Sequence, residues 1–136
     1  MQLHIQIVTP EKIILDTQAD EIIAPTTTGE IAILPHHIPL LTQLAPGELT
    51  IKKENKLEHF VVAGGFLEIG KDTVSVLADY AVHGEHISAV KAQEAKERAE
   101  KRMAEKKSEE DFAIAEAEFR RAILELKVAR KVKRTP

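Results

Sequence analysis

The hydrophobic residues of this chain follow two different periods, and the change between them falls near Gly84. Before that point apolar and polar residues alternate, as in Leu3, Ile5 and Ile7, which is the period of a strand with one buried face. Turns containing Gly and Pro interrupt the alternation at close spacing, so the pattern predicts roughly eight to ten short strands. Many short strands joined by such turns are typical of an all-β sandwich or barrel.

Beyond Gly84 the chain has no further glycine, and its only proline is the last residue. Ser88 is a suitable N-cap for a first helix, and Ser108, followed by three acidic residues, is a suitable N-cap for a second. The second helix carries apolar residues at alternating spacings of three and four, which is a heptad-like seam. These seam residues are Phe112, Ala115, Phe119, Ala122, Leu126 and Ala129. We therefore expect an antiparallel two-helix hairpin over residues 85–136, following a β-sandwich domain over residues 1–84.

Composition sets broad limits on what the chain can be. It has 136 residues, 43% of them hydrophobic, no cysteine and a net charge of −3. No apolar run approaches the length of a membrane span, and the first residues enter a strand directly, so we expect no leader segment. The acidic excess lies in residues 1–84 and the basic excess in residues 85–136, which predicts surfaces for different partners.

The second helix ends in a basic cluster, Lys127, Arg130, Lys131, Lys133 and Arg134. One interpretation is that these cations only complement the helix dipole and aid solubility. A second is an electrostatic contact with an acidic partner surface. Nucleic acid is a third, but aromatic residues make up 4% of the chain and fall in the predicted cores, so base stacking has no support.

The sequence offers no catalytic or metal-binding pattern. The six histidines are not accompanied by cysteine, and no H-E-x-x-H motif occurs. His83 and His86 fall in the joint between the two parts, where chance placement explains them better than a metal site does. Gly64 and Gly65 lack the lysine and hydroxyl residue of a phosphate-binding loop, and no nucleophile elbow occurs. We predict no enzyme and no cofactor.

Several of these segments resemble one known family. Residues 29–41, GEIAILPHHIPLL, are similar to its G-E-x-G-I-L-P-x-H-A-P-L-L stretch. Residues 64–69 and 74–79 are similar to its G-G-F-L-E-V and V-T-V-L-A-D segments, and residues 95–100 resemble part of its first helix. The family is that of the epsilon subunits of bacterial and chloroplast F-type ATP synthases, and the resemblance runs end to end.

The resemblance implies a ten-stranded N-terminal β-sandwich and a C-terminal helical hairpin. It implies a non-catalytic rotor subunit of a proton-translocating complex, coupling rotation of the c-ring to the catalytic head and bound to the gamma subunit and the c-ring. Glu30 would face the polar loops of the c-ring, and His37 would lie near the gamma contact. The protein would be peripheral to a bacterial plasma membrane, on the cytoplasmic side, or to a thylakoid membrane, on the stromal side.

The resemblance also gives the hairpin a regulatory role. In this family an extended hairpin inhibits ATP hydrolysis, and its basic end meets an acidic segment of a catalytic beta subunit. The candidate contacts in this chain are Arg121, Lys127, Arg130 and Lys131.

Some members of the family bind ATP on the folded hairpin through an Ile/Leu-Asp-x-x-Arg-Ala motif. Here Ser88 stands for the Asp and Lys91 for the Arg, and lysine cannot make the planar, forked contacts of arginine. Arg98 and Arg121 match assisting positions, but Glu125 stands where a further arginine is expected and would repel phosphate. An ATP-binding sensor, and a generic β-domain adaptor with a helical docking arm, are therefore the alternatives to a rotor subunit.

Overall fold

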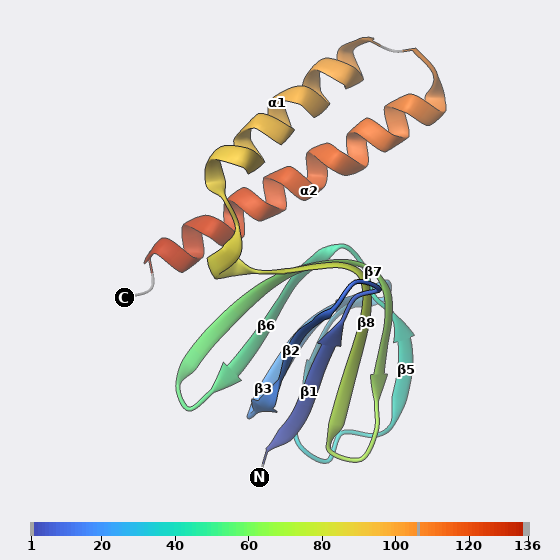
Figure 1. Cartoon of the computed structure of the whole chain (residues 1–136). Helices are drawn as coiled ribbons and strands as arrows, with labels where there is room; N and C mark the ends of the chain where they lie inside the picture. The colour runs from blue at the N-terminus through green and yellow to red at the C-terminus, as the bar shows by residue number, and fades with distance from the viewer. Residues whose placement is uncertain (1, 106, 135–136) are drawn as a thin grey trace. The chain divides into compact units, whose positions relative to one another are not determined.

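The computed structural model describes residues 2–105 and 107–134, and for residues 133 and 134 the helical backbone alone. The chain divides into two compact units, Met1–His83 and Gly84–Pro136. The first unit is built of strands and the second of helices (Figure 1). Among the described residues, no helix combines the length and the apolarity that crossing a membrane requires.

The strands of the first unit form one continuous hydrogen-bonded sheet in the order β2-β1-β8-β7-β6-β3-β4, with β5 paired to β7 (Figure 1). Neighbouring strands are antiparallel except β1 and β8, which are parallel. The strands are β1 (Leu3–Val8), β2 (Ile13–Ala19), β3 (Glu21–Thr26), β4 (Gly29–Ile33), β5 (Leu40–Gln43), β6 (Gly47–Lys53), β7 (Lys56–Ile69) and β8 (Thr73–His83).

Two long strands carry this sheet through both layers of the sandwich. The first half of β7 pairs with β6 and its second half pairs with β5, while β8 follows β7 along both halves. The change of partner falls at Gly64 and Gly65, which have φ angles of 71° and 99°. Glycine adopts such angles without the steric penalty that a Cβ brings. The described residues thus form eight strands, which is within the eight to ten that the sequence pattern predicts and fewer than the ten that the resemblance implies. β7 continues through Gly64 and Gly65, where the pattern predicted a break.

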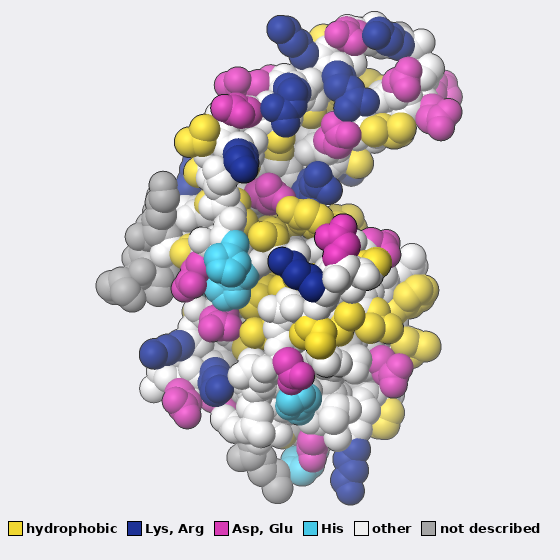
Figure 2. All heavy atoms as spheres, in the orientation of Figure 1, with side chains coloured by type: hydrophobic (Ala, Val, Ile, Leu, Met, Phe, Trp, Pro, Cys, Tyr) yellow, Lys and Arg dark blue, Asp and Glu magenta, His cyan; other side chains and the backbone are white. Residues whose placement is uncertain are grey.

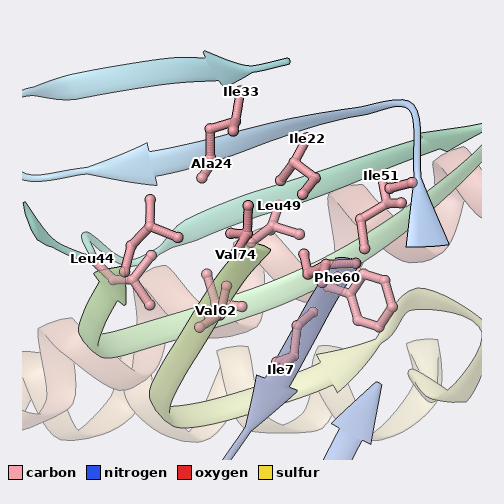
Figure 3. Close-up of a cluster of buried hydrophobic side chains, with 14 of the residues drawn as sticks. Ile7, Ile22, Ala24, Ile33, Leu44, Leu49, Ile51, Phe60, Val62 and Val74 are labelled. Atoms are coloured by element: carbon pink, nitrogen blue, oxygen red, sulfur yellow. The ribbon is translucent and has the colours of Figure 1, made fainter. Parts of the chain in front are cut away.

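The core of the sandwich is a single apolar cluster that draws on both layers (Figure 3). Alternate side chains are buried along β1, β3 and β6, as the sequence pattern predicts. The largest of the fully buried side chains is Phe60 of β7. Around it lie other residues of the cluster, Ile7, Ile22, Leu49, Ile51, Val62 and Val74.

The second unit is a hairpin of two helices, α1 (Ala89–Glu105) and α2 (Glu109–Arg134), preceded by the short 3-10 turn η1 (Gly84–His86). Both predicted caps are confirmed. The Ser88 hydroxyl accepts the N–H of Lys91 at 3.2 Å, and the Ser108 hydroxyl accepts the N–H of Asp111 at 3.0 Å.

Alanine methyl groups form the buried seam between α1 and α2. The seam alanines recur every seven residues on each helix and are no more than 5% exposed: Ala92 and Ala99 on α1, and Ala115, Ala122 and Ala129 on α2. Small residues let the two helix axes approach closely, which leaves larger neighbours at the margins of the seam. Phe112, predicted to lie in the seam, is accordingly 37% exposed.

Candidate functional site

The segment between β4 and β5 presents large apolar side chains to solvent. Leu34, Ile38 and Leu41 are 53%, 79% and 67% exposed. The backbone between them is ordered by a turn in which the N–H of His37 donates to the carbonyl of Leu34 at 3.2 Å. Exposed apolar side chains held on an ordered segment are characteristic of a protein–protein contact.

Of the predicted contact residues, Glu30 precedes this surface in sequence and His37 lies within it. Glu30 is exposed on β4, beside the β3–β4 turn. That turn is fixed by the buried Thr26, whose hydroxyl bonds to the carbonyl of Gly29 and accepts the N–H of Thr28 at 3.3 Å. His37 is half-buried, and its ring Nδ1 lies 2.7 Å from the carbonyl oxygen of Ile38. The structure therefore leaves the Glu30 carboxylate in solvent and folds the His37 ring back onto its own loop.

A second exposed apolar surface crosses the outside of the sandwich. The strand register aligns Phe66 of β7 with Leu77 of β8, Leu77 with Val8 of β1, and Val8 with Ile13 of β2. We call these four residues the apolar row. Phe66 and Leu77 are each 52% exposed and Ile13 is 59% exposed. A groove of about 480 Å³ is lined by three members of the row, Val8, Phe66 and Leu77, and also by Thr9, Pro10 and Gln43.

Sequence analysis missed the apolar row, although a signal for it exists. Each of its members is next to a core residue in sequence, as Phe66 is to Leu67 and Leu77 is to Val76. Two consecutive apolar residues in a strand point to opposite faces, so one of them must lie outside the core. Figure 2 shows apolar side chains at the surface of the sandwich domain on the face in view, and mixed acidic and basic side chains on the hairpin.

The hairpin separates the four predicted basic contacts into two groups. Lys127, Arg130 and Lys131 surround a hollow of about 390 Å³ on one side of α2, together with Lys96 of α1. The floor of this hollow is apolar and contains Ile123 and Leu126. We call this surface the basic hollow. Lys133 and Arg134, the remaining members of the predicted cluster, have side chains outside the described residues.

Arg121 lies in a different hollow, of about 320 Å³, on the α1–α2 hairpin. The structure brings it together there with Arg98, the other predicted nucleotide-binding residue, and with Arg102. Glu118 and Glu125 line the same hollow, and Glu118 accepts a hydrogen bond of 2.7 Å from Arg102. We call this the arginine–glutamate hollow. Its two carboxylates oppose the binding of a phosphate group beside the three guanidinium groups.

Four histidines lie beside single carboxylates. His4 is 2.7 Å from Asp16 and His59 is 2.8 Å from Glu48, whereas the His36–Asp72 and His83–Glu58 pairs are longer, at 3.8 Å and 4.0 Å. Within residues 2–105 and 107–134, no group of three or more metal-binding side chains gathers. The His59–Glu48 pair is the most enclosed of the four, with side chains 11% and 14% exposed, and no sequence motif predicted it.

An exposed apolar surface on the sandwich and a basic hollow on the hairpin are features expected of a subunit of a larger assembly. Comparison with known proteins identifies the kind of subunit. Residues 2–84 match the ATP synthase delta/epsilon chain β-sandwich domain, and residues 85–130 match the long α-helix domain of the same chain. The protein belongs to the ATP synthase delta/epsilon chain family.

Relatives in the family resemble the chain over nearly its whole length. The ATP synthase epsilon chain of Dehalococcoides mccartyi strain CBDB1 is 46% identical over 99% of this chain and 97% of its own. That of Caldanaerobacter subterraneus subsp. tengcongensis is 42% identical over 94% of both chains. Epsilon chains are non-catalytic subunits of ATP synthase, so the family resemblance seen in the sequence and the prediction that the chain is not itself an enzyme are both confirmed.

Solved structures agree with this assignment. A chain of the Euglena gracilis mitochondrial ATP synthase, in an OSCP/F1/c-ring assembly, superposes with a TM-score of 0.75 and 26% identity, over 97% of this chain and 81% of its own. A chain of the Tetrahymena thermophila central stalk and c-ring superposes with a TM-score of 0.54 over 65% of this chain and 72% of its own. Its identity of 21% makes it evidence for the fold alone.

Proposed function

We propose that this chain is a rotor subunit in the central stalk of a proton-translocating ATP synthase, where it couples rotation of the c-ring to the catalytic head. The observation that carries the proposal is the apolar surface of the sandwich domain in a chain whose relatives are epsilon chains. The likeness to a chain solved within an F1/c-ring assembly supports the same role. Residues 1–84 serve as the coupling domain and residues 85–136 as a regulatory domain.

The sandwich domain contacts two partners through different chemistry. The apolar row, together with His37, forms the contact with the gamma subunit, because a groove with an apolar floor favours burial against a large partner. Glu30 faces the polar loops of the c-ring, since its carboxylate extends into solvent from a turn that Thr26 fixes. Through these partners the protein is peripheral to the membrane, on the cytoplasmic side of a bacterial plasma membrane or the stromal side of a thylakoid.

The hairpin restrains ATP hydrolysis when it extends toward the catalytic head. The basic hollow supplies the contact, with Lys127, Arg130 and Lys131 facing an acidic segment of a catalytic beta subunit and the apolar floor packing against it. Arg121 is exposed but lines the other hollow, so it contacts a partner through a different side of the hairpin from the basic hollow.

The experiment that tests this role compares ATP hydrolysis by the reconstituted catalytic head with the full chain and with a chain ending at His86. Truncation is expected to raise hydrolysis several-fold while leaving binding to gamma intact. Equal hydrolysis with both chains, with both still bound to gamma, would remove the regulatory role and leave a coupling element. Failure of the full chain to bind gamma would favour a generic adaptor.

The arginine–glutamate hollow supports a second candidate function, that of an ATP sensor, only weakly. Arg98 and Arg121 converge there, but Glu118 and Glu125 occupy the same space. Ser88 and Lys91, which replace the acidic and arginine positions of the nucleotide motif, are not among the residues that line it.

A further inference from the structure

The turn at residues 34–37 holds a side-chain-bearing residue in a conformation that normally favours glycine. Pro35 is its second residue, His36 its third with a φ of 69°, and the N–H of His37 donates to the carbonyl of Leu34 at 3.2 Å. This is the arrangement of a type II turn, in which Gly or Asn is usual at the third position. His36 therefore needs support from outside the turn to keep this backbone angle.

Apolar burial does not provide that support. The side chains on either side of the turn, Leu34 and Ile38, are 53% and 79% exposed, so the core does not anchor this loop through them. Regular pairing with β7 begins at Leu40. The conformation of residues 34–39 must depend largely on hydrogen bonds to the backbone.

Asp72 makes such a bond from the β7–β8 hairpin. Its Oδ1 accepts the backbone N–H of His36 at 3.1 Å and lies 3.8 Å from His36 Nδ1. Asp72 belongs to the β7–β8 turn and itself has a φ of 54°. Its carbonyl accepts the N–H of His4 at 2.9 Å, which fixes the residue against β1. One residue thus joins three segments that are distant in sequence.

We propose that Asp72 is a positioning residue that holds the His36 turn in the conformation required for partner binding. The inference rests on the proposed role of this surface in contacting the rotor, and it adds a residue that does not itself touch the partner. If loss of the Asp72 carboxylate lowers the population of the turn to a tenth, the apparent affinity for the partner falls about ten-fold.

The test uses two substitutions of Asp72 in the full chain. Asp72→Gly keeps the positive φ accessible but removes the acceptor, whereas Asp72→Asn keeps both a suitable backbone angle and an acceptor oxygen. Lys71→Gly is the matched control, because it adds the same flexibility to the same turn and leaves the carboxylate in place. Two properties are measured, hydrogen exchange at the His36 amide and the affinity for a purified gamma–c-ring complex, with the thermal midpoint as a check on global stability.

Asp72→Gly should lose protection at the His36 amide and bind the complex about ten-fold more weakly, while Asp72→Asn and Lys71→Gly stay within about two-fold of the unmodified chain. If the His36 amide of Asp72→Gly exchanges as slowly as in the unmodified chain, the Asp72 carboxylate does not hold the turn. Lost protection with unchanged affinity would overturn the positioning role. Equal weakening in all three variants, with lowered midpoints, would show general destabilisation and also overturn it. If the unmodified chain fails to bind the complex, the proposed function is wrong, and the positioning role is wrong with it. The exchange data still show separately whether the Asp72 carboxylate protects the His36 amide.

Discussion

The backbone of Gly65 passes so close to Leu77 that no side chain fits between them: a Cβ at position 65 would collide with the carbonyl oxygen of Leu77. Gly65 also has a φ of 99°. We expect Gly65→Ala to lower the free energy of unfolding by about 3 kcal/mol, combining steric overlap with the cost of a positive φ. Urea unfolding of the sandwich domain within the full chain measures this.

The substitution Gly29→Ala separates the cost of the positive φ from the cost of steric overlap. Gly29 has a φ of 122°, but an added Cβ there meets nothing within 4 Å. Only the backbone cost applies, so the loss should be about 1 kcal/mol. Equal losses at positions 29 and 65 would show that the close approach of β7 to β8 at Leu77 is not a packing constraint.

Acid should weaken the sandwich domain through Asp20. The pKa of Asp20 is lowered chiefly because its carboxylate accepts the N–H of Glu54 at 2.9 Å, and secondarily by a hydrogen bond from Gln2. A group whose pKa is depressed on folding stabilises the protein above its unfolded pKa, about 3.9 for Asp, and that stabilisation is lost as the pH falls through the folded value.

The check compares urea midpoints of the unmodified chain and Asp20→Asn between about pH 6 and pH 3. The substitution should lower the midpoint most at the upper end of this range, and the two curves should converge at the lower end. A constant difference across the range would mean that the Asp20 charge does not stabilise the β6–β7 turn.

The apolar row provides a test of the gamma contact with a closely matched control. Leu77 and Leu57 are both 52% exposed leucines on strands of the sandwich, but only Leu77 belongs to the row. Leu77→Lys should weaken binding to gamma at least ten-fold, since it places a charge in a buried apolar contact. Leu57→Lys should change binding less than about two-fold. Equal effects of the two substitutions in a binding titration would exclude the row as the contact.

The basic hollow should control inhibition of hydrolysis. Replacing Lys127, Arg130 and Lys131 together by Gln should weaken the inhibitory contact about ten-fold, at roughly 0.5 kcal/mol for each exposed ion pair. ATP hydrolysis by the reconstituted head reports the effect. The control removes three charges elsewhere on the hairpin, at Lys101, Lys107 and Arg120, all exposed. If both triple variants raise ATP hydrolysis equally, the change in net charge explains the effect and the basic hollow does not.

Nucleotide binding should be absent in the unmodified chain and improved by one substitution. The carboxylate of Glu125 lines the arginine–glutamate hollow, so we expect no binding of magnesium ATP at concentrations up to about 1 mM. Glu125→Arg should bring the dissociation constant into a range that calorimetry detects. Glu116→Arg, on the same helix but outside the hollow, is the control. Micromolar binding by the unmodified chain would contradict the electrostatic interpretation.

The sequence predicted the two-domain architecture, both helix caps and the alanine positions of the hairpin seam, because each follows from local periodicity or capping chemistry. The ten strands implied by the resemblance are not found among the described residues, and β7 runs through Gly64 and Gly65, which look like a strand end in sequence. The separation of Arg121 from Lys127 could have been predicted, since residues six apart lie about 120° apart around a helix. The hydrogen bond between Asp72 and His36 could not, because nothing local relates the β7–β8 turn to the connection between β4 and β5.

The continuity of β7 and β8 gives the sandwich a mechanical property that its packing alone would not. Moving one layer relative to the other would strain the continuous backbones of β7 and β8, in addition to separating apolar faces. A torque applied to one layer is therefore transmitted to the other along peptide bonds. In a rotating shaft, such a domain turns as a single stiff part.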